Sequence, residues 1–215
     1  MKARIILILA LFALLSVLTL PAGAQTLTSD LVFLKVGYIP VSVVDYQLEG
    51  TKDPNQKGLA VQGEYNLNLK PLLVGFGVEY QRLRTKDFTG SGDKNLDSNF
   101  IQPMLSLKFA TDGGFYIGGG ISGKYLMSAY QVGPNYEFTK KMDAWANGIL
   151  GFYFPVSEGV YLDLEGRFGY NLTKKQYSEI ESATIPKTTT KQDINANYDI
   201  AVYFGIGFRA FSTNM

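Results

Sequence analysis

The feature that most constrains this chain is an alternation of apolar and polar residues that recurs along most of its length. In residues 160–165 the sequence runs Val-Tyr-Leu-Asp-Leu-Glu, and comparable stretches precede and follow it. Successive side chains of a strand point to opposite faces, so a period of two predicts strands with one apolar and one polar face. The expected strands are residues 31–47, 58–68, 72–85, 98–110, 115–129, 142–154, 160–177 and 197–211.

Three of these segments are irregular. Pro40 predicts a bulge or bend in the first strand. Pro103 lies inside the fourth strand, where it has no N–H to donate to a neighbour, so it marks a bulge or counts against that strand. Residues 142–154 carry large apolar side chains at both odd and even positions, and the pattern does not separate their two faces.

The connections between the expected strands alternate in length. Those after the second, fourth and sixth strands are short (residues 69–71, 111–114 and 155–159), whereas the others are longer and polar. Consecutive antiparallel strands place their connections alternately at the two ends of a barrel, so one end carries turns and the other carries loops. We therefore predict an all-β fold, an eight-stranded antiparallel up-and-down transmembrane β-barrel.

The N-terminus is typical of a secretory signal peptide. Lys2 and Arg4 precede an apolar run over residues 5–20, and Ala22-Gly23-Ala24 forms a small-residue cleavage site. The alternative, a retained membrane helix, would need about 20 apolar residues, more than this run provides. We expect residues 1–24 to be a cleaved signal peptide and residues 25–215 to form one barrel domain.

Composition narrows the function further. Without Lys2 and Arg4, 18 of the 20 Lys and Arg residues remain against 19 Asp and Glu, which gives no electrostatic reason to expect a nucleic-acid partner. The chain has no cysteine, which excludes disulfides, thiolate chemistry and cysteine-based metal sites. The 14 Tyr, 14 Phe and 23 Gly of an exported chain favour a secreted all-β protein or a transmembrane barrel.

Alternation alone does not say which face points inward, because a soluble barrel also alternates, with its apolar face inside. Three features favour the membrane orientation. Many segments reach the 9–11 residues that a tilted membrane strand needs. The polar face carries repeated glycines, which a narrow interior requires, and tyrosines near the strand ends of the apolar face suit an aromatic girdle.

In the membrane orientation the charged side chains of the strands face the lumen. They comprise five cations and five anions: Lys35, Lys108, Lys124, Arg167 and Arg209, and Glu64, Glu79, Asp163, Glu165 and Asp199. Unpaired charges in a narrow interior of low dielectric constant are costly, and opposite partners relieve that cost. Because side chains can fill the interior of an eight-stranded barrel, we expect a salt-bridged plug rather than a wide aqueous channel.

The sequence resembles the small eight-stranded outer-membrane proteins of the OmpA-barrel and OmpX type, often called the porin family. The likeness lies in the signal peptide, the eight-strand meander and the final strand, residues 203–211, whose alternating apolar residues end on Phe211. The resemblance implies residence in the outer membrane of a Gram-negative bacterium and insertion by the barrel-assembly machinery. The chain departs from the family pattern by continuing through residues 212–215 after the final aromatic residue.

The residue types present leave little room for catalysis. The absence of histidine removes the Ser-His-Asp and Cys-His arrangements and histidine-based zinc sites. Asp163 and Glu165 lie two apart on one strand face, roughly 6–7 Å between Cα atoms, which is near the spacing of glycosidase carboxylates. Arg167 follows on the same face and favours a structural ion cluster instead. We predict no enzyme, no cofactor and no metal.

One basic cluster lies where the third strand leaves the apolar band on the loop side. Arg82, Arg84 and Lys86 could contact lipopolysaccharide phosphates there. The alternative is that these are solvated charges at the base of a loop.

The sequence leaves three hypotheses for the role of the chain. The first is a non-enzymatic outer-membrane barrel with a structural or surface-interaction role through its external loops and contacts with membrane lipid. The second is a narrow pore for small solutes or ions, and the third is a soluble extracytoplasmic barrel that binds an apolar ligand.

Overall fold

The computed structural model describes residues 29–46, 55–85, 96–131, 137–138, 142–173, 176–181 and 189–210. The predicted signal peptide, Lys86 and residues 211–215 lie outside these ranges. The described residues form ten strands: β1 (Leu31–Tyr46), β2 (Asn55–Leu69), β3 (Leu72–Thr85), β4 (Leu96–Ala110), β5 (Phe115–Gln131), β6 (Glu137–Phe138), β7 (Met142–Ser157), β8 (Val160–Asn171), β9 (Gln176–Glu181) and β10 (Thr189–Arg209). These segments contain no helix long and apolar enough to cross a membrane.

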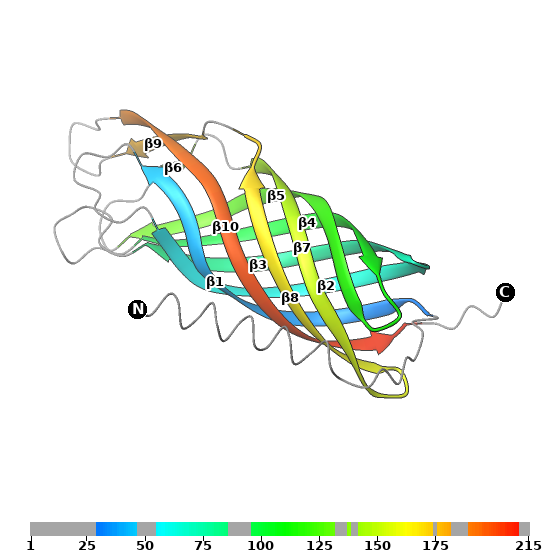
Figure 1. The fold of residues 1–215 in the computed structure, drawn as a ribbon. Coiled ribbons are helices and arrows are strands. Elements are labelled where there is room, and N and C mark those ends of the chain that lie inside the picture. Colours follow the sequence, from blue (N-terminus) through cyan, green and yellow to red (C-terminus); the bar gives the residue numbers. More distant parts are fainter. Residues whose placement is uncertain are drawn as a thin grey trace, which may run out of the picture.

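Eight of the strands close into a barrel. They follow the order β1-β2-β3-β4-β5-β7-β8-β10, and β10 pairs antiparallel with β1 to complete the ring. Each strand is therefore a neighbour of the one before it, and Figure 1 shows them inclined around a common axis. The predicted eight-stranded antiparallel up-and-down barrel is confirmed.

The N-terminal part of β10 extends beyond the end of β8. Its residues 189–194 pair with β9, and β9 pairs with the two-residue strand β6. In Figure 1 these strands lie together at one end of the barrel. The predicted seventh strand, residues 160–177, is thus divided between β8 and β9, and the last strand starts at residue 189, earlier than the predicted residue 197.

The two faces of the barrel differ sharply in chemistry. On β3, Glu79 is 1% exposed and faces the lumen, whereas Phe76 and Val78 are more than half exposed on the outside. The same division holds on β1, where Lys35 is fully buried and Leu34 is 57% exposed. The apolar face points outward, as a strand in a bilayer requires, whereas a soluble barrel that binds an apolar ligand would have it inside.

Both prolines that interrupt the pattern are accommodated in strands, by different means. The pairing of β1 with β2 and with β10 shifts by one residue around Pro40, which is a β-bulge as predicted. Pro103 pairs with Val78 of β3, and the register between β4 and β5 is unchanged across it. No bulge forms at Pro103, although the ladder to β5 lacks pairs at Gln102 and Pro103.

The end of the barrel opposite β6 and β9 carries short turns. They connect β2 to β3, β4 to β5 and β7 to β8, and two of them place a glycine at positive φ: Gly114 at 88° and Gly159 at 78°. Residues with a Cβ rarely adopt this conformation, so these glycines permit the tight reversals. The three short connections therefore lie at one end of the barrel, as the sequence predicts.

Candidate functional site: the lumen and the outer rim

The centre of the lumen is a cluster of charged side chains around Lys35 of β1. The Lys35 ammonium lies 2.6 Å from Glu64, 2.7 Å from Asp163 and 2.6 Å from Glu165, and all four side chains are fully buried. Three carboxylates, one from β2 and two from β8, therefore surround the ammonium, and Lys35 donates a hydrogen bond to Glu165.

Glu165 extends this cluster toward both sides of the barrel. On one side it lies 3.3 Å from Lys108 of β4, which also pairs with Glu64. On the other side it accepts a 2.5 Å bond from Arg167, whose guanidinium reaches across the lumen to Glu79 of β3 at 2.6 Å. A continuous chain of ion pairs therefore connects β1, β2, β3, β4 and β8.

An aromatic layer lies between this cluster and the turn end. The rings of Tyr116 and Tyr153 stack with centroids 4.3 Å apart, and Phe33 stacks on Tyr153 at 5.0 Å. The Tyr116 hydroxyl donates to Asp163 at 2.8 Å, which ties the layer to the ion pairs. Tyr116, Tyr153 and Phe33 are each no more than 1% exposed.

The loop-side half of the lumen is also filled. Lys124 of β5 pairs with Asp199 of β10 at 3.2 Å, and its ammonium lies 4.7 Å from the centroid of the Trp145 ring. Beside it, Gln102 donates to the Ser122 hydroxyl at 2.7 Å. A second apolar cluster joins Ile39, Ala60, Leu83, Ala201 and Tyr203.

The structure brings nine of the ten predicted lumen charges together. Each of the nine is at most 5% exposed and makes at least one ion pair. Arg209 differs, because it is the last residue of β10 and lies partly exposed at the turn end. Within the described residues it makes no ion pair, so the expectation that five cations meet five anions is wrong for Arg209.

Sequence reasoning missed Asp143 of β7. This carboxylate is 2% exposed on the lumen face, in line with Trp145 and Asn147. The alternation in β7 is in fact regular, since these residues are buried while Ala144 and Gly148 are exposed. The signal was hidden because β7 directs large apolar side chains both into the lumen and toward the outside.

Glycines make room for the large lumen side chains at two positions on β10. A Cβ at Gly205 would lie 2.8 Å from Cγ of Lys35, and one at Gly207 would overlap the ring of Phe33. The steric explanation for glycines on the polar face therefore applies at both positions.

The arrangement offers little to catalysis in the described part of the chain. Asp163 and Glu165, the two carboxylates with glycosidase-like spacing, both contact Lys35, and Glu165 also contacts Lys108 and Arg167. Among the described residues no group of three or more His, Cys, Asp or Glu side chains could hold a metal ion.

The basic cluster of β3 lies on the outside of the barrel, at the loop end. Arg84 donates to Asp97 of β4 through Nε at 2.6 Å and Nη2 at 2.8 Å, and Arg82 donates to the same carboxylate at 3.1 Å. The hydrogen bond from Arg84 holds the pKa of Asp97 below its ordinary value. The sequence did not reveal this acidic partner, which pairing of β3 with β4 places opposite Arg84.

Comparison with solved structures shows the same architecture at low sequence identity. Over 84% of the chain and 95% of its counterpart, the fold is similar to the outer membrane protein OprG from Pseudomonas aeruginosa (12% identity, TM-score 0.57). A major outer membrane protein from Thermus thermophilus aligns over 85% of this chain and all of its own (13% identity, TM-score 0.50). At these identities the likeness concerns the fold alone.

The family comparison covers nearly the whole sequence. No curated protein matches the chain. In contrast, the model of the family described as "Outer membrane protein beta-barrel domain" matches residues 10–208. The match includes all of the closed barrel except Arg209, the last residue of β10. The chain therefore belongs to the outer-membrane β-barrel domain family.

Proposed function

We propose that this protein is a non-enzymatic barrel of a Gram-negative outer membrane, with a closed lumen and a structural or surface-interaction role through its external loops. The observation that carries the proposal is the continuous ion-pair chain from Lys35 through Glu165 and Arg167 to Glu79, which crosses the lumen. A conducting path would have to pass through these side chains.

The layers on either side support closure. The stacked rings of Tyr116 and Tyr153 occupy the lumen on the turn side, and the Lys124–Asp199 pair with Trp145 occupies it on the loop side. Breaking one buried ion pair by removing a partner costs about 3–5 kcal/mol. An opening movement would have to separate several such pairs at once.

The absence of enzymatic activity is supported by the residue types. The chain has no histidine or cysteine, and the lumen carboxylates with suitable spacing are held by cations. A functional role on the outside is left to the loops and to the surface that faces lipid.

Single-channel recording in planar bilayers tests this proposal. Full-length mature protein, reconstituted and shown to be folded by its gel mobility before and after heating, is expected to be electrically silent. The opposite result, steady openings whose ion selectivity changes in Glu79→Gln or Lys124→Gln, would establish a narrow pore and overturn the closed-lumen proposal.

Cell fractionation tests the location separately. Recovery in the outer-membrane fraction, with release by detergent but not by high salt, is expected. Recovery in the soluble periplasm without detergent would contradict the assignment.

A further inference from the structure

The outward face of β2 to β5 carries two features that the closed lumen does not use. The first is the outer rim cluster, which we define as Lys57, Arg82, Arg84 and Asp97. Strand pairing aligns Lys57, Arg84 and Asp97 in one row across β2, β3 and β4. Lys57 is exposed, and the Arg82 and Arg84 side chains are 61% and 52% exposed. The cluster therefore presents three cations and one anion to the surroundings.

Asp97 positions the two guanidinium groups and leaves most of their N–H donors free. It accepts two hydrogen bonds from Arg84 and one from Arg82. An arginine has five N–H donors, so most remain available on both side chains. Two arginines held side by side form a fork that suits the oxygens of a phosphate.

The second feature is a groove nearer the middle of the apolar band, lined at its base by Gly63, Val78, Pro103 and Gly123. These residues come from four successive strands and lie in one row, because Gly63 pairs with Val78, Val78 pairs with Pro103, and the unshifted register sets Gly123 opposite Pro103. Nothing lies within 4 Å of the position that a Cβ on Gly63 would occupy. The surface is recessed along this row because its side chains are small or absent.

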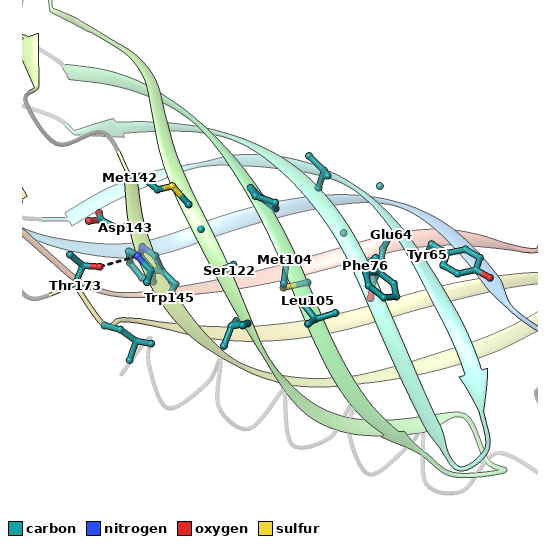
Figure 2. A pocket seen from close by; sticks show the side chains of 18 of the residues that line it. Glu64, Tyr65, Phe76, Met104, Leu105, Ser122, Met142, Asp143, Trp145 and Thr173 are labelled. Carbon is teal, nitrogen blue, oxygen red and sulfur yellow. Dashed lines mark hydrogen bonds between the residues drawn. The ribbon is translucent and has the colours of Figure 1, made fainter.

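Larger apolar side chains form one edge of this groove. Figure 2 shows Tyr65, Phe76 and Leu105 along the side nearer the turns. Phe76 is 53% and Leu105 43% exposed on the surface that faces the bilayer. The occupant of the groove must therefore be apolar and come from within the membrane.

The rim cluster and the groove lie on the same strands in a fixed order. From Val78 to Arg82 is four residues along β3, or about 13 Å at the rise of a strand. The cluster is at the loop end, which faces the outer leaflet in barrels of this type. A lipid of that leaflet has the same order, with charged phosphate at the surface and acyl chains below it.

We propose that this face binds lipopolysaccharide, the phosphate-bearing glycolipid of the outer leaflet. A phosphate lies on Arg82 and Arg84, and an acyl chain lies in the groove at Gly63 and Pro103. The inference goes beyond the closed-lumen role and does not depend on it, because the proposed contacts at Gly63, Arg82, Arg84 and Pro103 all lie on the outward face of the barrel. A second copy of the chain is the alternative occupant of the groove, but an apolar contact between copies gives no role to the excess positive charge at the rim.

Binding of purified lipopolysaccharide to the full-length mature protein in detergent tests the headgroup contact. In Arg82→Gln/Arg84→Gln, affinity is expected to fall about 10-fold or more, because charge-assisted hydrogen bonds to phosphate are lost. Lys70 is an exposed lysine at the turn end, far along the strands from the outer rim cluster. Lys70→Gln therefore removes a cation outside the proposed site and is expected to leave the affinity for lipopolysaccharide unchanged. Equal affinities for the double variant and the parent protein would overturn the proposal.

A second pair of variants tests the groove. Gly63→Leu fills it from an unobstructed position, whereas Gly166→Leu adds the same side chain to the outward face of β8, where the nearest atom to the new Cβ is the Leu150 oxygen at 3.8 Å. Binding is expected to weaken in Gly63→Leu and to persist in Gly166→Leu. Gel mobility before and after heating verifies that all four variants are folded. Equal binding by the two leucine variants would refute the acyl-chain contact.

Ligand variants and mass measurement separate the possible occupants. Dephosphorylated lipopolysaccharide is expected to bind like the Arg82→Gln/Arg84→Gln variant, and phosphatidylglycerol or inorganic phosphate is expected to compete poorly. Full competition by phosphatidylglycerol would overturn selectivity for the glycolipid. A dimer by sedimentation that Gly63→Leu converts to a monomer, without a change in lipopolysaccharide binding, would assign the groove to a second copy and overturn the proposal.

Discussion

Lys35 of β1 and Asp163 of β8 form a 2.7 Å ion pair directly over Gly205, the residue of β10 that pairs with both of them. The intervening strand would normally separate the two side chains. At Gly205 there is no side chain, and both partners lean into the vacant space: a Cβ there would lie 2.8 Å from Lys35 and 3.4 Å from Asp163. The central ion cluster thus depends on one glycine of the last strand.

Gly205→Val is therefore expected to destabilise the barrel by about 3 kcal/mol, the scale of a broken buried ion pair. The free energy of unfolding of Gly205→Val is compared with that of the parent protein by urea titration in lipid vesicles. Gly166→Val adds the same side chain on the outward face of β8 and is expected to change stability little. Similar values for the two valine variants would show that the ion cluster tolerates displacement.

Because Arg167 and Glu79 form a buried ion pair, we expect a large interaction free energy between them in a double-mutant cycle of unfolding free energies. Arg167→Met leaves Glu79 buried without its cation and is expected to cost about 3–5 kcal/mol. Adding Glu79→Leu removes the stranded charge, so the double variant is expected to be more stable than the Arg167→Met single variant. Additive effects in the same urea titration would mean that the two side chains do not interact in the membrane.

Trp145 is the single tryptophan of the chain and is 1% exposed beside Lys124. Its fluorescence therefore reports on access to the lumen. In the folded barrel we expect acrylamide, a polar quencher dissolved in water, to quench Trp145 far less than in urea-unfolded protein. Quenching of the folded form as strong as that of the unfolded form would reveal a water-filled lumen.

Asp97 is expected to titrate below its ordinary pKa, because Arg84 hydrogen-bonds to the ionised carboxylate. With the folded pKa below the unfolded one, the contribution of this pair to stability is present above the ordinary pKa and is lost as pH falls through the folded value. NMR titration of the Asp97 carboxyl carbon should give a lowered midpoint that rises in Arg84→Gln. An unchanged midpoint in that variant would contradict the pairing.

Much of the fold could be predicted because one local signal repeats in every strand. The alternation of side chains determines strand faces, and the alternation of connection lengths determines the meander. The prediction weakened at β7, where Trp145 and Tyr153 fill the lumen while Leu150 faces outward. When both faces accept large apolar side chains, a pattern based on polarity no longer separates them, and Asp143 was missed.

The partners of the lumen charges were less predictable than their positions. Lys35 meets Asp163 and Glu165 across the intervening β10, and Arg167 meets Glu79 across the lumen. Such pairs depend on barrel diameter and strand register, which a single strand does not encode. The groove has the same origin, since Gly63, Val78 and Pro103 become neighbours only after three strands pair.

The pairing of β10 with β1 has a consequence for the order in which the molecule can be built. Leu31 lies opposite Arg209 and Val43 opposite Tyr198, so closure joins the first strand to the last. The ring cannot form until the final strand has emerged, and contacts so distant in sequence make folding slow. Until then two strand edges stay open to unwanted pairing. A chain shortened by β10 would lose both the seam and Gly205, and would be left as an open sheet.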